Sequence, residues 1–354
     1  MGITITDQKS CWDLLKETEL PIFMYGMGLG AEKILSVFHD KGITCAGFFA
    51  SSGFVRGHQF KGHLVHTLQE IEEKVDDFII VLAFAAGYDP LYSDILKIAE
   101  RHTLVAPDVP VAGDGLFDRE YFERNRDLFE RVYDLLADER SKTCYENIIN
   151  FKITGDPKFL QLCTSGRDEV YDELMTLKDD MVFVDLGAYK GDTALEFSEA
   201  CEKKGVKYKT IYAFEPNSKN YTKLVKNTSD LNIKCYNAAA YDESGKIGFT
   251  ENEGRMARIS DEGIAIDMLA VDDIVEEDAD IIKLDVEGAE YMALRGAASH
   301  IRRGAELMCA LYHRNEDMFK LPLYINDLAP DLKLYIRHEL YIPAWETNLY
   351  AVKG

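Results

Sequence analysis

The chain lacks the features that mark a secreted, membrane-spanning or disulfide-stabilised protein. Its seven cysteines lie far apart and form no Cys-x-x-Cys pair, which indicates reduced thiols and argues against a zinc site. The first ten residues contain no apolar segment of the kind found in signal peptides. The longest apolar run, residues 78–87, is too short to span a bilayer. We therefore expect a cytoplasmic protein without a membrane span.

Basic residues are also scarce relative to acidic ones. Lys and Arg number 40 against 62 Asp and Glu, for a net charge of −22. A nucleic-acid partner needs a basic face that neutralises phosphates, so we expect none. The segment 261–290 is especially acidic, and it is either a solvated loop or a carboxylate-rich rim that could hold a divalent cation weakly. At 354 residues two domains are expected, and a homo-oligomer is compatible with the composition.

Residues 1–114 are expected to form a first Rossmann-like unit. Strands alternate with amphipathic helices, which favours a parallel sheet; the expected strands are 21–25, 44–49, 78–84 and 103–105, and the helices 31–41, 67–75 and 91–100. Gly26-x-Gly28-x-x-Ala31 fits the dinucleotide fingerprint. The next strand, however, ends in Ala50-Ser51-Ser52, where a ribose-binding acid would stand. A structural unit and a site for a nucleotide or phosphorylated ligand both remain open.

Residues 115–178 are expected to form a helical connector. Apolar residues recur there at helical spacing and predict one buried stripe: Phe122, Leu128, Phe129, Val132, Leu135 and Leu136.

Residues 179–354 are expected to form a second, seven-stranded α/β unit. Its predicted strands are 182–186, 210–214, 233–238, 281–285, 306–311, 333–337 and 349–352, with a hairpin or flap at 245–266. The fold class is therefore α/β, with two Rossmann-like units joined by helices.

Polar residues follow the ends of the strands in this second unit. Asp185 and Gly187 end the first strand, and Glu215 ends the second, where a ribose diol could be bound by its carboxylate. Asp285 and Glu287 follow the fourth strand. Because ligands of open α/β sheets bind at the carboxyl ends of the strands, these carboxylates are expected to meet in one crevice. His313 follows the fifth strand and is expected at the same edge.

The order of these motifs resembles that of the FkbM family of S-adenosylmethionine-dependent methyltransferases. The matching segments are VDLGAYKGDT, AFEP, VDDI, IKLDVEGAE and YHR, and the resemblance covers about residues 168–354. It implies the seven-stranded class I methyltransferase fold and methyl transfer, mostly to hydroxyl groups of carbohydrates or secondary metabolites. The acceptor would then be a small molecule or a glycan.

The resemblance also implies roles for individual residues. Those expected to bind S-adenosylmethionine are Asp185, Gly187, Ala188, Gly191 and Glu215, with Asn217 and Asn237 near the adenosine. Asp285, Glu287 and His313 would face the acceptor, where His313 or Asp285 could take the proton of an attacking hydroxyl. A divalent cation could acidify that hydroxyl instead, but no His/Cys spacing supports a metal site, and none is assigned.

Two other functions are compatible with the sequence. An NAD-dependent oxidoreductase would use both Rossmann-like units, although Gly187 and Gly191 lie four apart and do not fit GxGxxG. A non-catalytic protein with a degenerate methyltransferase domain would sense the cofactor or dock a partner.

Overall fold

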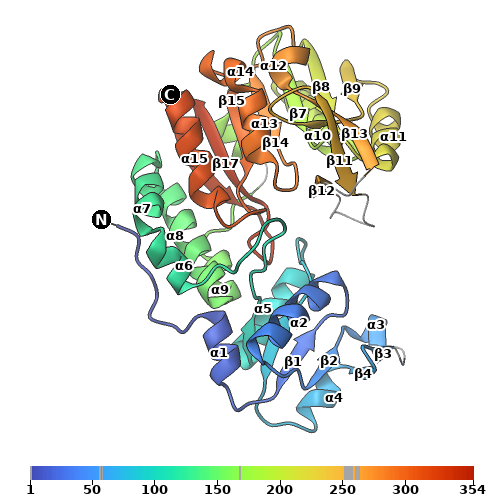
Figure 1. The fold of residues 1–354 in the computed structure, drawn as a ribbon, viewed down its shortest axis with the longest axis vertical. Helices are drawn as coiled ribbons and strands as arrows, with labels where there is room; N and C mark the ends of the chain where they lie inside the picture. The colour runs from blue at the N-terminus through green and yellow to red at the C-terminus, as the bar shows by residue number, and fades with distance from the viewer. Residues whose placement is uncertain (1, 56, 58, 167–168, 251–257, 260–263) are drawn as a thin grey trace.

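The computed structural model describes residues 2–55, 57, 59–166, 169–250, 258–259 and 264–354. Figure 1 shows an N-terminal α/β unit (blue), a second α/β unit (yellow to red) and a group of green helices beside both. No helix in these described ranges is long and apolar enough to cross a membrane.

The N-terminal unit is a six-stranded sheet in the order β3-β4-β2-β1-β5-β6. Its strands are β1 (Ile22–Tyr25), β2 (Gly47–Phe49), β3 (Gln59–Phe60), β4 (His63–His66), β5 (Ile79–Leu82) and β6 (Thr103–Val105). Its helices are α1 (Cys11–Glu17), α2 (Leu29–Lys41), α3 (Ser52–Val55), α4 (Leu68–Glu72) and α5 (Leu91–Arg101). All pairs are parallel except β3 with β4, and these two strands and α1 were not predicted from the sequence.

The connecting helices are α6 (Arg119–Arg124), α7 (Arg126–Leu135), α8 (Glu139–Thr154) and α9 (Pro157–Gln161), followed by one π-helical turn, η1 (Val170–Leu174). The residues of the predicted stripe belong to two helices, because Asn125 ends α6 and precedes α7. Phe122, Phe129 and Val132 of this stripe are fully buried, as their spacing predicts.

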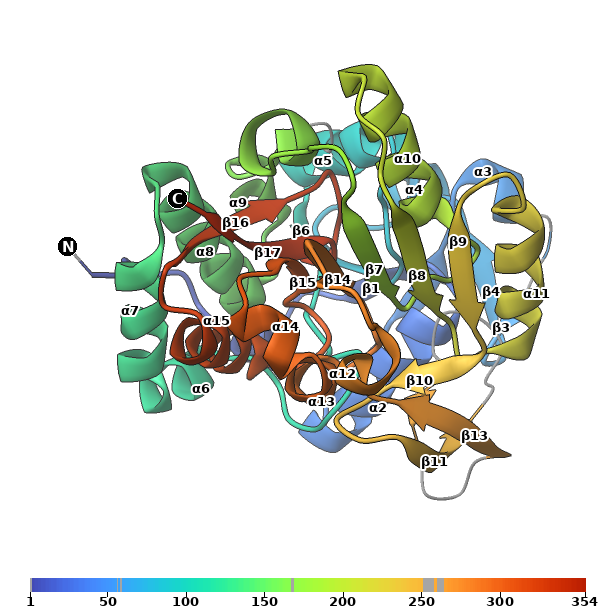
Figure 2. The same cartoon turned by 90° about the horizontal axis from the view of Figure 1, so that it is seen from above.

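The second unit is the expected seven-stranded sheet, in the order β16-β17-β15-β14-β7-β8-β9. Its strands are β7 (Val182–Leu186), β8 (Thr210–Phe214), β9 (Ile233–Tyr236), β14 (Ile281–Leu284), β15 (Glu306–Ala310), β16 (Leu332–His338) and β17 (Thr347–Lys353). Only β17 runs antiparallel to its neighbours. Figure 2 shows α10 (Asp192–Lys204) on one face of the sheet, and α13 (Glu290–Gly296) and α14 (Ala298–Arg302) on the other. The other helices here are α11 (Ser218–Asn227), α12 (Val271–Ile274) and α15 (Asp317–Leu328).

A third, four-stranded sheet extends the second unit in the order β10-β13-β11-β12. Its strands are β10 (Ala238–Ala240), β11 (Gly245–Thr250), β12 (Arg258–Ile259) and β13 (Ile264–Leu269). The strand predicted at 233–238 therefore ends at Tyr236, and the chain enters the third sheet at Ala238. The predicted hairpin at 245–266 is present as the antiparallel pair β11–β13, although its residues 251–257 and 260–263 lie outside the described ranges.

One hydrophobic core joins the three parts of the chain. A single cluster of buried side chains includes Leu82 of the N-terminal sheet, Phe129 of α7 and Leu307 of β15. The backbone also joins the two units directly, because Ala86 and Ile342 each donate an N–H to the other's carbonyl, at 2.8 and 2.9 Å. The two sheets are therefore held in one arrangement by contacts between units.

Candidate active site

The site begins where the chain order of the seven-stranded sheet reverses, between β7 and β14. Asp185, near the end of β7, is fully buried, and its Oδ1 lies 3.2 Å from Nζ of Lys283 in β14. Burial raises the pKa of this carboxyl, although the adjacent ammonium opposes the shift. Lys283 also donates to the carbonyl of Gly187 at 2.9 Å. This lysine therefore ties the ends of both central strands to the glycine turn.

Gly187 is required by close packing at that turn. Its φ is +80°, and a Cβ there would lie 1.8 Å from the carbonyl oxygen of Asp285, so no side chain fits. The N–H groups of Gly187 and Ala188 both donate to the carbonyl of Phe214, which joins the turn to β8.

Ala188 and Gly191 do not lie on the cavity at this edge of the sheet. Ala188 is buried against Ala213 and Leu224. Gly191 has φ +89°, and a Cβ there would approach Thr228 to 2.5 Å. The structure therefore accounts for Gly191 by the packing of α10 against the end of α11, whereas the family resemblance implied a role in binding S-adenosylmethionine.

Glu215 follows β8 and faces the cavity from the other side of the turn. It is 6% exposed, and its two oxygens accept N–H groups from Tyr189 and Asn217, both at 2.9 Å. Burial raises the pKa of this carboxyl to about 7, even though both N–H groups favour the ionised form. The two N–H groups thus hold the carboxylate in one orientation at the cavity.

The two asparagines have structural partners. Asn217 lines the cavity, but its Oδ1 caps α11 by accepting the N–H groups of Lys219 and Asn220 at 3.1 Å. Asn237 lies off the cavity and donates to the carbonyls of Glu215 and Pro216 at 2.8 and 3.1 Å. It therefore fixes the loop that carries Glu215.

The three residues expected to face the acceptor do come together. Nε2 of His313 lies 3.4 Å from Asp285 Oδ1 and 3.7 Å from Glu287 Oε2, while Nδ1 lies 2.9 Å from Oε1 of Glu290. Glu287 has φ +54°, a conformation that non-glycine residues rarely adopt and that is enriched at functional sites. Glu290 is fully buried and also accepts the N–H of Val286 at 2.8 Å.

These carboxylates decide the protonation state of His313. Burial alone would lower the pKa of the imidazole, but Glu290, Asp285 and Glu287 outweigh it and raise that pKa to about 10. The ring is therefore an imidazolium at neutral pH. In this state a carboxylate, not His313, is the group able to accept a proton.

Asp285, Glu290 and His313 also have donor atoms close enough for a metal ion, all within 4.8 Å of one another. In the metal-free protein, Nδ1 of His313 lies 2.9 Å from Oε1 of Glu290 as an ion pair. These residues are better described as an ion-pair cluster.

Several residues of the site were not identified from the sequence. Lys283 and Tyr312 lie beside the named acids, and the Tyr312 hydroxyl donates to Asp285 Oδ1 at 3.3 Å. Lys283 could have been identified from its position one residue before the end of β14. In the pairing of β14 with β7, that position lies directly beside Asp185. Glu290 is the first residue of α13, where a helix N-terminus favours an acid, but its side chain is ion-paired with His313.

Two cavities meet at this site. The first, of about 260 Å³, is lined by Gly187, Glu215, Asn217, Lys283 and Asp285 among others. The second, of about 840 Å³, extends to the N-terminal sheet and includes His313. Glu287, Tyr312 and Glu346 line both, so a ligand in one cavity would lie beside a ligand in the other.

Comparison with known proteins identifies the second unit. Residues 185–342 match the model of the methyltransferase FkbM domain. The C-terminal unit is an FkbM methyltransferase domain. At the level of its class, the chain is thus an S-adenosylmethionine-dependent methyltransferase.

The fold extends beyond this domain. The structure of methyltransferase FkbM from Methylobacillus flagellatus KT shares 19% sequence identity and a TM-score of 0.75, over 99% of this chain and 94% of that one. The two proteins therefore share the fold of the N-terminal unit and the connecting helices as well.

Other solved structures align with about half of the chain. An rRNA methylase from Streptococcus thermophilus aligns at 15% identity and TM-score 0.35, over 52% of this chain and 92% of that one. A putative methyltransferase from Streptococcus mutans, in complex with SAH, aligns at 13% identity and TM-score 0.34. That alignment covers 53% of this chain and 94% of the other. No curated protein matches the sequence.

Proposed function

We propose that the chain transfers a methyl group from S-adenosylmethionine to a hydroxyl group of a small-molecule or glycan acceptor. The observation that carries this proposal is the carboxylate–imidazolium cluster of Asp285, Glu287 and His313 at the junction of the two cavities. A hydroxyl is a weak nucleophile unless a base takes its proton as the new bond forms. The cluster supplies that base beside the methyl-donor cavity.

The residues of the smaller cavity fit a cationic nucleoside. Acids outnumber bases among the lining side chains described by the structure, with Lys283 as the one ammonium and Asp192, Glu196, Glu215, Asp285, Glu287, Glu339 and Glu346 as the acids. In this proposal Glu215, whose orientation is fixed by the N–H groups of Tyr189 and Asn217, holds the ribose hydroxyls, and the bare backbone of Gly187 permits a close approach. When bound, S-adenosylmethionine supplies an electrophilic methyl group on a sulfonium.

Glu287 is the favoured base. It lines both cavities, whereas Asp285 lines only the smaller one. With S-adenosylmethionine held in the smaller cavity, methyl transfer to the acceptor oxygen would be balanced by loss of the hydroxyl proton to the Glu287 carboxylate, with S-adenosylhomocysteine as the leaving group. The His313 imidazolium stabilises the carboxylates until that step, and Glu290 fixes the ring.

Calorimetry with S-adenosylhomocysteine and NAD, followed by transfer assays with labelled S-adenosylmethionine, tests the proposal. We expect S-adenosylhomocysteine to bind and NAD not to bind. Glu287→Gln should lower the transfer rate by about 10²–10⁴-fold without changing affinity for S-adenosylhomocysteine. The exposed Glu199→Gln on α10 is the matched control. Binding of NAD alone, or methyl transfer exclusively to nitrogen or carbon, would refute the proposal.

A further inference from the structure

The N-terminal sheet faces the methyltransferase site with the edge at which α/β sheets bind ligands. The chain order of this sheet reverses between β1 and β5, so its ligand crevice is expected at their carboxyl ends. The 840 Å³ cavity lies there, since Gly26 after β1 and Ala83 after β5 line it. Its opposite wall is formed by Glu287, Tyr312 and His313 of the methyltransferase domain.

Contacts between the units border this cavity, which stays open to solvent. The Ala86–Ile342 backbone bridge lies beside it, and a Cβ on Gly87 would meet the Tyr341 ring at 2.3 Å. Pro343 and Trp345, which follow Ile342, line the cavity itself. Its volume falls within the range of small-molecule sites, about 300–1,000 Å³.

The wall of the cavity is apolar even where water can reach it. Leu29, Phe54 and Tyr88 line it and are 56%, 68% and 61% exposed, among the most exposed large apolar side chains of the described residues. Such side chains scattered singly need no explanation, but their concentration around one cavity indicates a binding surface. Phe84 and Trp345 add further aromatic surface.

The glycine fingerprint of this unit is explained by packing. A Cβ on Gly30 would lie 2.3 Å from the Ala83 carbonyl, and Ala31 is fully buried. After β2, Ser51 bonds to the Tyr25 hydroxyl at 2.8 Å, in the place where a ribose-binding acid would stand.

The charged groups on the N-terminal wall also have partners. Lys33 donates to the carbonyl of Pro110 at 3.4 Å, and Asp94 pairs with Lys97 at 2.8 Å. With Glu287 and Glu346 on the far wall, the cavity does not favour a phosphorylated ligand.

We infer that this cavity binds the non-reacting part of the methyl acceptor, and that this part is an uncharged, apolar ring system. The inference rests on the proposed function. The ligand of this cavity is a methyl acceptor only because Glu287 and Tyr312 line both this cavity and the proposed cofactor cavity. Burial of the ring between the two units would direct the acceptor hydroxyl to Glu287. The N-terminal unit thereby selects the acceptor, and the methyltransferase domain supplies the chemistry.

Fluorescence titration of the full chain with N-phenyl-1-naphthylamine, an uncharged ring probe, tests the cavity directly. Gly28 lines the cavity with open space around its Cβ position, so Gly28→Leu fills the cavity without backbone strain. Leu29→Glu places a charge at its wall, at a helix N-terminus where an acid is tolerated. Both variants should weaken probe binding at least tenfold. Gly166→Leu and Leu162→Glu, at exposed positions away from the cavity, are the controls and should bind the probe normally.

A second titration separates this inference from the proposed function. Affinity for S-adenosylhomocysteine should be the same in all four variants, and hydroxylated ring compounds that displace the probe should be methylated with a raised KM in Gly28→Leu. Equal probe binding by Gly28→Leu and the wild type would overturn the inference while leaving the cofactor site intact. Displacement by UDP or ADP, but not by uncharged ring compounds, would also overturn it. If the wild type does not bind S-adenosylhomocysteine, the proposed function is refuted instead.

Discussion

In the proposed cofactor site, Glu215 would link the protonation of a single residue to cofactor binding. Its pKa is raised from 4.5 to about 7 by burial, so between these values the folded chain holds a proton that the unfolded chain releases. The contribution of this group to the free energy of unfolding therefore falls as pH rises through that window. Ribose hydroxyls donate hydrogen bonds, and the ionised carboxylate accepts them more strongly than the protonated one.

Affinity for S-adenosylhomocysteine should consequently rise between pH 6 and pH 8, by about tenfold if one proton is released on binding. Isothermal titration calorimetry across this range measures the effect. Glu215→Gln should bind more weakly and lose the pH dependence, while its circular dichroism spectrum shows an intact fold. The same pH dependence in Glu215→Gln would assign the proton to another group.

The charge of His313 should stabilise the folded protein in a pH-dependent way. The pKa of the imidazole is raised from 6.5 to about 10, so its contribution to stability is fully present below pH 6.5 and is lost as pH rises toward 10. Removing it leaves the fully buried Glu290 without its cationic partner. His313→Gln should therefore lower the free energy of unfolding by about 3–5 kcal/mol at pH 6.5.

Denaturant unfolding of the wild type and His313→Gln from pH 6 to pH 10 tests this prediction. The difference between the two proteins should shrink as pH rises. A difference that is constant over this range would show that the ring stabilises the site by packing, not by its charge.

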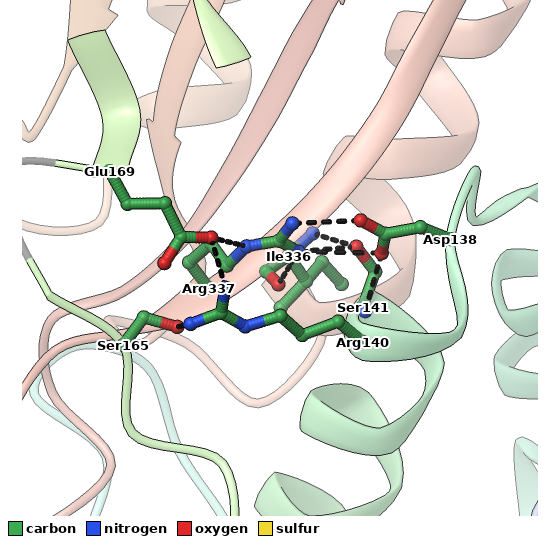
Figure 3. A network of polar contacts seen from close by, with 7 residues as sticks. All are labelled: Asp138, Arg140, Ser141, Ser165, Glu169, Ile336 and Arg337. Atoms are coloured by element: carbon green, nitrogen blue, oxygen red, sulfur yellow. Dashed lines mark hydrogen bonds and ion pairs between the residues drawn. The ribbon is translucent and has the colours of Figure 1, made fainter. Parts of the chain in front are cut away.

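At the scale of elements, Arg337 joins the helical connector to the outer strand β16. Figure 3 shows its guanidinium between Glu169, Asp138 and Ser141. Nε donates to Glu169, Nη2 to Asp138 and Nη1 to Ser141, each at 2.8 Å, and the Arg337 side chain is 5% exposed. The Ser141 hydroxyl also accepts the N–H of Ile336 at 3.0 Å. Helix α8 is thus fixed against an edge of the methyltransferase sheet.

Arg337→Met should destabilise the chain by about 3–5 kcal/mol, because Asp138 and Glu169 lose a buried cation. Arg140 pairs with the same Glu169 at 2.7 Å, but its side chain is 49% exposed. Arg140→Met is the matched control and should cost less than about 1 kcal/mol, because water screens an exposed pair. Urea unfolding of the two variants compares them directly, and equal losses would contradict a special role for Arg337.

At the scale of the whole molecule, the continuous core predicts cooperative unfolding. Side chains of the N-terminal sheet, the connecting helices and the methyltransferase domain belong to one buried cluster, and the Ala86–Ile342 bridge joins the units. We expect one transition in differential scanning calorimetry, with similar calorimetric and van't Hoff enthalpies. Two separated transitions would show that the units unfold independently.

The elements whose bounds could be predicted from the sequence are those marked by a local pattern of residues. Strands 182–186 and 210–214 were predicted to the residue, because short apolar runs end there at a glycine and at an acid. The split between β9 and β10 was not predictable, since Asn237 turns the chain into another sheet through hydrogen bonds to the Glu215 loop. Gly187 and Gly191 look alike in sequence, but one meets the Asp285 backbone and the other Thr228.

The two α/β units and the acids at the strand ends follow from local patterns in the chain, because alternating periodicity and turn residues act over a few neighbouring positions. Three other properties depend on the folded arrangement: Lys283 pairs with Asp185, three carboxylates keep His313 protonated, and an apolar cavity joins the two units. Those properties depend on distances between residues far apart in the chain and on their burial. Periodicity carries no information about either.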